Sequence, residues 1–182
     1  MENIIFASAN QNKFFEVQSI LSSRNIPVTF SQIHLVEVQS DSPEEIVREK
    51  VKAAFAKIEG QVIVEDDGLF INSLGGFPGP YSSFVFRTIG NNGILKLLAG
   101  SVERSAYFCS LIAFYNGITM SISHGRVDGR ISDRVTEGGW GYDPIFIPDG
   151  SDLTFAELNK SKNEYSHRKR ALEKFALWYL KL

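Results

Sequence analysis

The pair Asn116-Gly117 constrains the fold of this chain more than any other feature of its sequence. It stands between two long segments, 104–115 and 118–132, that are rich in residues favouring strands. Asn-Gly readily adopts the positive φ angles of a tight hairpin turn, so the two segments are predicted to be neighbouring antiparallel strands.

The first half of the chain alternates short apolar runs with helical patterns. The run 4–7 is followed by a polar loop and then by apolar residues at helical spacing: Phe14, Val17, Ile20 and Leu21. Ser42, Pro43 and Glu45 mark the start of a helix that we expect to reach Ile58, before a second apolar run at 62–64. Further helices are expected over 91–99 and 166–182. Strands joined by helices, followed by a hairpin, predict an α/β protein with a mixed sheet.

Composition narrows the classes of partner. The 182 residues suit one domain or two joined lobes. The net charge of −2 does not suggest a polyanion such as DNA as a partner, and no apolar run reaches membrane-spanning length. A single cysteine, Cys109, cannot form an internal disulfide, and Met1-Glu2-Asn3 lacks the basic region of a signal peptide. These features predict a cytoplasmic protein that binds neither nucleic acid nor membranes.

Aromatic residues alternate with glycine in the segment 139–143, and basic residues follow it: Lys162, His167 and Arg168. Aromatic faces can stack on a base. A carboxylate can accept a hydrogen bond from a ring N–H, and an arginine can donate to a carbonyl or a phosphate. Together these residues are the parts of a purine-nucleotide pocket.

A polar loop between the first strand and the first helix contains Ser8, Asn10 and Lys13. Backbone N–H groups at the start of a helix, together with these side chains, could hold phosphates. Taken alone, the loop fits an ordinary Asn-rich turn better, because it is neither a Walker loop nor a glycine fingerprint. Lys50, in the middle of the next helix, would by itself be assigned to a solvated helix face.

Three adjacent acids, Glu65, Asp66 and Asp67, are expected where the strand beginning at Val62 ends. Such a cluster is costly unless a cation neutralises it. Mg²⁺ favours a few carboxylates together with water and substrate phosphates, so a metal site is predicted ahead of an acidic surface turn. Glu37 could supply a further ligand.

These features occur together, and in this order, in one enzyme family. The chain resembles the inosine triphosphate pyrophosphatases along nearly its whole length. The matching stretches are Ser8-x-Asn10-x-x-Lys13, Glu37-Val38-Gln39, Glu44 to Lys50, Glu65-Asp66-x-Gly68-Leu69, Gly75-Gly76-x-Pro78-Gly79-x-Tyr81-Ser82, Gly139-Trp140-Gly141-Tyr142-Asp143-Pro144-Ile145-Phe146, Thr154-Phe155-Ala156-Glu157 and Ser166-His167-Arg168.

The resemblance implies a Mg²⁺-dependent enzyme that hydrolyses ITP, dITP and XTP to the monophosphate and pyrophosphate. It also implies an elongated mixed sheet flanked by helices, with two lobes of a single domain, 1–182, around a central nucleotide-binding cleft. Members of the family are usually homodimers.

The resemblance also implies roles for individual residues. The triphosphate would be held by Ser8, Asn10, Lys13 and Lys50. The metal would be held by Glu37, Asp66 and Glu65, with Asp66 also the general base. The base and its neighbouring phosphates would be contacted by Trp140, Tyr142, Asp143, Lys162, His167 and Arg168.

One stretch departs from the family pattern. Where many members have Asp-Asp-Ser-Gly, this chain has Glu65-Asp66-Asp67-Gly68. Which of the three carboxylates is ligand and which is base therefore stays open. Two other functions also stay open, namely a different nucleoside triphosphate hydrolase and a non-catalytic nucleotide-binding protein.

Overall fold

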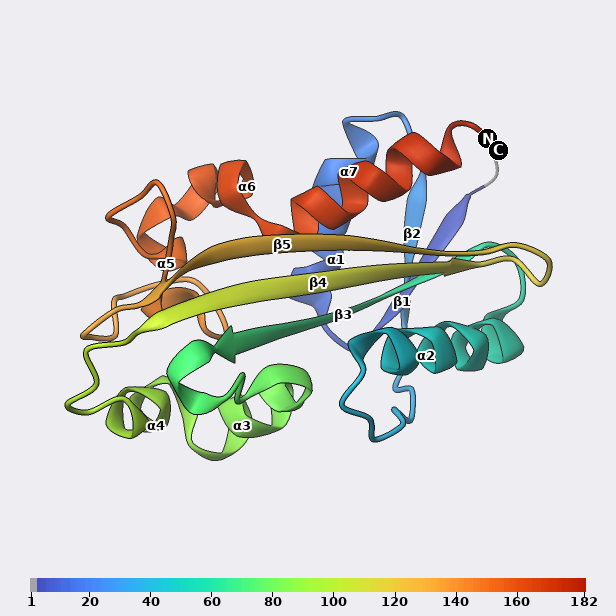
Figure 1. Cartoon of the computed structure of the whole chain (residues 1–182). Coiled ribbons are helices and arrows are strands. Elements are labelled where there is room, and N and C mark those ends of the chain that lie inside the picture. Colours follow the sequence, from blue (N-terminus) through green and yellow to red (C-terminus); the bar gives the residue numbers. More distant parts are fainter. Residues whose placement is uncertain (1–2) are drawn as a thin grey trace. The chain divides into compact units, whose positions relative to one another are not determined.

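The computed structural model describes residues 3–182, apart from the side chain of Lys160 (Figure 1). Met1 and Glu2, on which the expectation of no signal peptide partly rests, lie outside the described residues. The strands are β1 (Ile4–Ser8), β2 (Val28–Gln32), β3 (Val62–Ile71), β4 (Ser105–Tyr115), β5 (Met120–Ile131) and β6 (Phe146–Pro148). The helices are α1 (Gln11–Ser22), α2 (Pro43–Ile58), α3 (Ser82–Thr88), α4 (Gly90–Leu97), α5 (Phe155–Leu158), α6 (Lys162–Tyr165) and α7 (His167–Tyr179).

The six strands form one mixed sheet in the order β2-β1-β3-β4-β5-β6. β1 pairs in parallel with β2 and with β3, whereas β5 and β6 are antiparallel. The predicted turn joins β4 to β5, and Oδ1 of Asn116 accepts hydrogen bonds from the backbone N–H groups of Ile118 and Thr119. The predicted α/β class with a mixed sheet is confirmed.

The chain divides into two compact units, each built from separate stretches. Unit 1 comprises the residues up to 66, 110–125 and 168–182, and unit 2 comprises 67–109 and 126–167. Strands β3, β4 and β5 contribute residues to both units.

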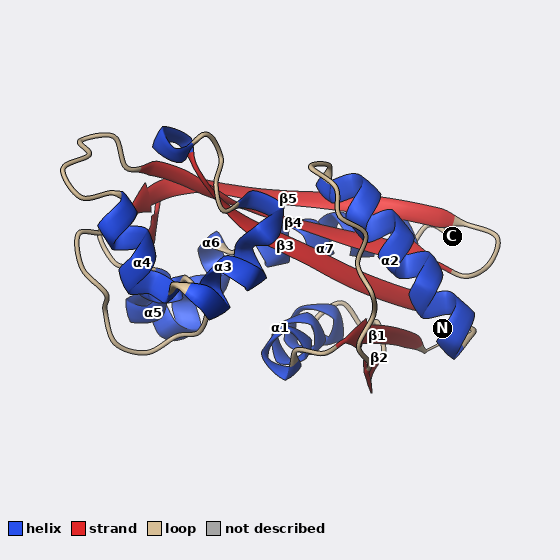
Figure 2. Cartoon of the chain, turned by 90° about the horizontal axis from the view of Figure 1, so that it is seen from below, coloured by secondary structure: helices blue, strands red, loops and turns tan. Residues whose placement is uncertain are grey.

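In unit 1, helices cover both faces of the strands. Figures 1 and 2 show α7 and α2 on opposite faces. The face under α1 and α7 is packed with large apolar side chains, including Phe6, Ile63, Phe114 and Phe175, all fully buried. On the other face, Phe55 of α2 packs edge-on against Tyr115, with ring centroids 4.9 Å apart. The second apolar core of the chain lies in unit 2, where Phe108, Phe146 and Phe155 are neighbours.

β3 is longer than the sequence predicts. The apolar run 62–64 indicates a short strand that ends at the three acids, but the strand continues through them to Ile71. Gly68 lets the backbone at Gly79 pack closely on this part of the strand, because a Cβ atom at Gly68 would lie 2.6 Å from the backbone oxygen of Gly79. The three acids therefore lie within a strand, so their side chains point alternately to its two faces.

No helix within residues 3–182 is long and apolar enough to cross a membrane.

Candidate functional site

The loop between β1 and α1 is stabilised by its own side chains. Oδ1 of Asn10 accepts from the backbone N–H groups of Asn12, at 2.9 Å, and Lys13, at 3.4 Å, so it caps α1. The Ser8 hydroxyl accepts from the backbone N–H of Asn10 at 3.1 Å. The first turn of α1 contains no acidic residue, so the positive end of the helix dipole keeps its field. Lys13, in this turn, has its Nζ atom 3.4 Å from Oε2 of Glu65.

Lys50, which extends from α2, lies at a convergence of carboxylates. Its Nζ atom is 2.5 Å from Oε1 of Glu37 and 3.6 Å from Oδ1 of Asp66. It also donates to the backbone oxygen of Glu65 at 3.0 Å. The structure thus brings together three of the predicted residues, Glu37, Lys50 and Asp66, and Lys50 does not lie on an ordinary solvated helix face.

The carboxylates of Glu37 and Asp66 fit a hard divalent cation. Both approach the same positive charge, and carboxylate oxygens are the ligands that Mg²⁺ prefers. Within residues 3–182, no three side chains of His, Cys, Asp or Glu are grouped so that they could hold a metal ion. A pair of carboxylates is enough for Mg²⁺ when water and substrate phosphates complete the shell, so the donor set suits a metal that arrives with a nucleotide.

Glu65 does not belong to this convergence. It is only 2% exposed, and its Oε1 atom accepts from the Ser110 hydroxyl and from Nε of Arg168, each at 2.7 Å. Arg168 is fully buried and also donates to Glu16. Glu65, predicted as a metal ligand, and Arg168, predicted as a base contact, thus compensate each other's charge inside unit 1.

The alternation of side chains along β3 explains the arrangement of the three acids. Successive residues of a strand point to opposite faces, so Glu65 and Asp67 share one face and Asp66 lies on the other. Each carboxylate has its own cationic or imidazole neighbour: Arg168 and Lys13 for Glu65, Lys50 for Asp66, and His167 for Asp67. Three adjacent acids are tolerated because their charges are separated by the strand and compensated individually.

In unit 2, the glycine-rich segment places an aspartate against a lysine. Nζ of Lys162 lies 2.8 Å from Oδ2 of Asp143, and both residues are buried. The same Oδ2 accepts from the backbone N–H of Trp140 at 3.3 Å, and Nζ of Lys162 lies 5.0 Å from the centre of the Trp140 ring. Gly139 permits this approach, because a Cβ atom there would lie 2.7 Å from Cβ of Asp143. Trp140, Asp143 and Lys162 thus form one polar and aromatic cluster.

Tyr142, predicted to enclose a base, is packed on protein. Its side chain is buried in the core of unit 2, and its hydroxyl donates to the backbone oxygen of Ser82 at 2.9 Å. Phe86 contacts its ring edge-on, and burial raises the pKa of the phenol. These contacts anchor the segment that holds Trp140 and Asp143.

His167 lies among aromatic rings. It is 2% exposed and stacks on Phe108 with a centroid separation of 4.6 Å and an interplanar angle of 9°. Its Nε2 atom is 3.7 Å from Oδ2 of Asp67. The predicted site residues of unit 2 are therefore found in two sets, one around Asp143 and one around His167.

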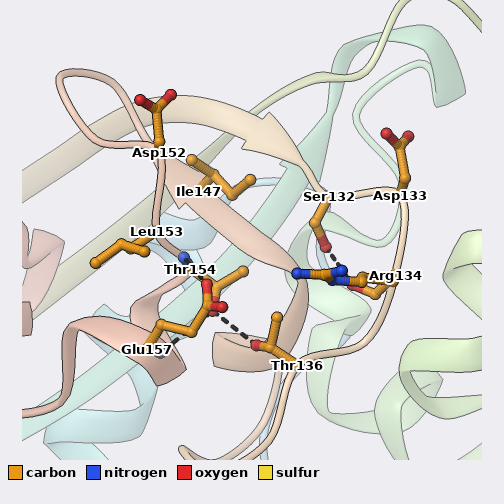
Figure 3. Close-up of a pocket in the computed structure, with 9 residues that line it drawn as sticks. All are labelled: Ser132, Asp133, Arg134, Thr136, Ile147, Asp152, Leu153, Thr154 and Glu157. Carbon is orange, nitrogen blue, oxygen red and sulfur yellow. Dashed lines mark hydrogen bonds between the residues drawn. The ribbon is translucent and has the colours of Figure 1, made fainter.

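A separate cavity of about 350 Å³ lies in unit 2, and none of the predicted site residues lines it (Figure 3). Its lining residues are Ser132, Asp133, Arg134, Thr136, Ile147, Asp152, Leu153, Thr154 and Glu157. Thr154 and Glu157 form a reciprocal capping box at the start of α5. The matching stretch that begins at Thr154 therefore has a structural explanation, since α5 precedes the short helix that carries Lys162.

Sequence reasoning missed Glu16 and Ser110, which complete the buried charge network around Arg168. Glu16 lies one helical turn after Lys13, on α1, and this spacing was the signal available. Ser110 lies in an apolar strand and carries no pattern that would single it out.

Comparison with known proteins gives relatives along the whole chain. A dITP/XTP pyrophosphatase of Methanopyrus kandleri is 46% identical over 179 residues, which cover 97% of this chain and 95% of the relative. One from Saccharolobus solfataricus is 46% identical over 169 residues, covering 92% and 88%. A HAM1 protein from Coxiella burnetii superposes with a TM-score of 0.86 at 29% identity, covering 100% of both chains. The Ham1 protein of Staphylococcus aureus superposes with a TM-score of 0.84 at 28% identity, covering 99% of both chains.

The family comparison agrees with these relatives. The Ham1 family matches residues 4–178, which includes every residue singled out from the sequence as a possible ligand or catalytic group. The resemblance identified from the motifs is confirmed, and this chain belongs to the Ham1 family.

Proposed function

We propose that this protein is a nucleoside triphosphate pyrophosphatase that hydrolyses dITP, ITP and XTP to the monophosphate and pyrophosphate. One observation carries the proposal: relatives named dITP/XTP pyrophosphatase are 46% identical over nearly the full length of both chains. The geometry is consistent with it, because one cluster of side chains suits a triphosphate and a metal, and another suits a base.

Glu37 and Asp66 are the residues proposed to hold Mg²⁺. When bound, the metal would neutralise charge on the phosphates and favour loss of pyrophosphate. Lys50 lies between these carboxylates, so its ammonium would turn from them toward the phosphates once a divalent cation supplies the compensating charge. Lys13, at the start of α1, is proposed to contact the outer phosphates, and the side chains of Ser8 and Asn10 are proposed to add further donors.

The bond that breaks joins the α-phosphorus to the oxygen bridging to the β-phosphorus. A water oxygen attacks the α-phosphorus, the bridging oxygen leaves with pyrophosphate, and the carboxylate of Asp66 accepts the proton from the water. General base catalysis of this kind is worth roughly 10²- to 10⁴-fold. The two lysines stabilise the charge that accumulates on the leaving group.

Base selection is assigned to Asp143, Lys162 and Trp140. Hypoxanthine and xanthine present N1–H as a donor and O6 as an acceptor. Oδ2 of Asp143 is held by Lys162 and Trp140, so we propose that Oδ1 accepts from N1–H while Lys162 donates to O6. Adenine reverses both groups, and the resulting buried mismatch can discriminate by about 10⁴-fold. Guanine matches at both positions, so its rejection needs a contact near C2 that none of these residues supplies.

The decisive experiment is turnover of a panel of triphosphates with separate detection of pyrophosphate and orthophosphate. The panel contains dITP, ITP, XTP, dATP, dGTP and dCTP, each with and without Mg²⁺. We expect pyrophosphate from the first three only, and only with Mg²⁺. Orthophosphate release would indicate a different hydrolase, and tight binding without turnover would indicate a non-catalytic nucleotide-binding protein.

The proposal also includes a homodimer in the cytoplasm that needs neither nucleic acid nor membranes. The family resemblance supports the dimer, and the net charge of −2 fits a small anion as ligand better than a polyanion. Sedimentation equilibrium over a range of protein concentrations would measure the state of association directly.

A further inference from the structure

Asp67 has no part in the reaction described above, although it directly follows Asp66 in the chain. It lies on the same face of β3 as Glu65, whose charge is compensated by Arg168. Asp67 lies close to a basic group of unit 2, because the Nε2 atom of His167 is 3.7 Å from its Oδ2 atom. The side chain of Asp67 is 16% exposed and that of His167 is 3% exposed, so water screens the pair only weakly.

Two aromatic rings pack against the His167 imidazole. Phe108 is parallel to it at 4.6 Å, and Phe155 is nearly parallel at 6.2 Å with an angle of 18°. This packing fixes the plane of the imidazole, but stacking alone does not distinguish two orientations related by a flip about the bond to the ring. A charged group at the ring edge does distinguish them, because a carboxylate accepts from an N–H and is repelled by a bare nitrogen.

We propose that Asp67 is a positioning residue that selects one orientation of His167, with the proton on Nε2, and thereby prepares the base-binding part of the site. The inference rests on the proposed function, and on the role in base contact that the family resemblance implies for His167. The separation of 3.7 Å is longer than a hydrogen bond, and polar contacts in a site commonly shorten when substrate binds.

The variants Asp67→Ala and Asp67→Asn test this role. Alanine removes the acceptor, and asparagine keeps an amide oxygen without the charge. A matched control is Glu44→Gln, because Glu44 forms the other His–carboxylate pair, 3.1 Å from Nε2 of His124, at an exposed position of unit 1. We expect KM for dITP and XTP to rise about three- to tenfold in Asp67→Ala, less in Asp67→Asn and not in the control, with kcat nearly unchanged.

Inorganic triphosphate serves as a probe that lacks a base. Its inhibition constant should be the same in wild type and in Asp67→Ala. An equal rise of this constant and of KM would place the effect on the phosphate side and overturn the inference. A loss of thermal stability with unchanged KM would also overturn it, because Asp67 would then be only structural.

Side-chain nitrogen NMR of the full chain without nucleotide gives a readout independent of activity. The chain has three histidines, so the signals of His167 can be assigned from a His167→Gln sample. We expect the pattern of a proton on Nε2 in wild type, an altered pattern in Asp67→Ala and no change in Glu44→Gln. An unchanged pattern would overturn the inference. If wild type did not hydrolyse dITP or XTP, the proposed function would fail, and the NMR comparison would still decide whether Asp67 orients His167.

Discussion

At the scale of single residues, Asp66 is expected to be the side chain on which turnover depends most. Asp66→Asn keeps the shape but removes the charge and the basicity, so kcat should fall by roughly 10²- to 10⁴-fold while nucleotide binding persists. Steady-state kinetics and calorimetric titration with dITP would measure the two effects. Glu65→Gln is the comparison, since Glu65 is buried against Arg168 and should lose stability first. If Asp66→Asn turned over dITP near the wild-type rate, Asp66 could not be the general base.

A variant of Asp143 tests whether this residue recognises the base as proposed. Asp143→Asn can rotate its amide to donate a hydrogen bond, which lowers kcat/KM for dITP and narrows the dITP:dATP ratio. Loss of a charge-assisted hydrogen bond suggests roughly 1.5–3 kcal/mol, or about one to two decades. The alternative is that Asp143 serves only to cap its turn through the N–H of Trp140. In that case the melting temperature would fall and the substrate ratio would not change.

The buried phenol of Tyr142 should make the free energy of unfolding depend on pH. Its phenol has an ordinary pKa of 10.0, and burial raises the pKa in the folded chain. Above pH 10 the unfolded chain therefore binds fewer protons than the folded one, so the free energy of unfolding decreases as pH rises. The slope for one group is at most about 1.4 kcal/mol per pH unit. Urea unfolding between about pH 9 and 11 should show a shallower decrease in Tyr142→Phe than in wild type; equal slopes would exclude this phenol as the cause.

At the scale of elements, the capping box of α5 is expected to matter for substrate binding as well as stability. Thr154 is 1% exposed, and its hydroxyl also bonds with that of Thr136 at 2.7 Å. Thr154→Ala should cost about 1–2 kcal/mol and raise KM, because the chain leads from α5 to Lys162. Urea unfolding and kinetics on the same samples check both expectations.

Local signals explain which elements could be predicted. The helix α2 was predicted with its observed bounds, because Ser42 and Pro43 define its start and its apolar spacing continues to Ile58. The hairpin was predicted because Asn116 and Gly117 form its turn. By contrast β2 has only five residues, and its place in the sheet depends on pairing with β1 rather than on its own pattern. The predicted end of β3 was wrong, because the side chains that compensate the charges of its three acids are remote in sequence.

The same distinction applies to the candidate site. The motifs identified the residue types and the family, since those are local and ordered along the chain. They could not reveal that Arg168 and Tyr142 are buried, because burial depends on what packs around a side chain. Glu16 and Arg168 are far apart in the sequence, and only folding brings their charges together.

At the scale of the molecule, the buried network around Arg168 joins α1, β3 and α7 within unit 1. Arg168→Ala would leave Glu65 and Glu16 without their shared counter-charge, and the expected loss is about 3–5 kcal/mol. Arg24→Ala is the control, since Arg24 pairs with Glu173 near the surface and exposed pairs contribute at most about 1 kcal/mol. Chemical denaturation measures both, and similar losses in the two variants would contradict the role of the network.

The division of unit 1 into separate stretches has a consequence for how the chain is made. Its apolar core includes Ile4 and Phe6 from the first strand, but also Leu172, Phe175 and Tyr179 from α7. A nascent chain emerging from the ribosome cannot close this core until Tyr179 has been synthesised. Until then the first strands expose an apolar face that invites association with other chains. The risk of aggregation is therefore expected to be greatest while the chain is being synthesised, and smaller once it has folded.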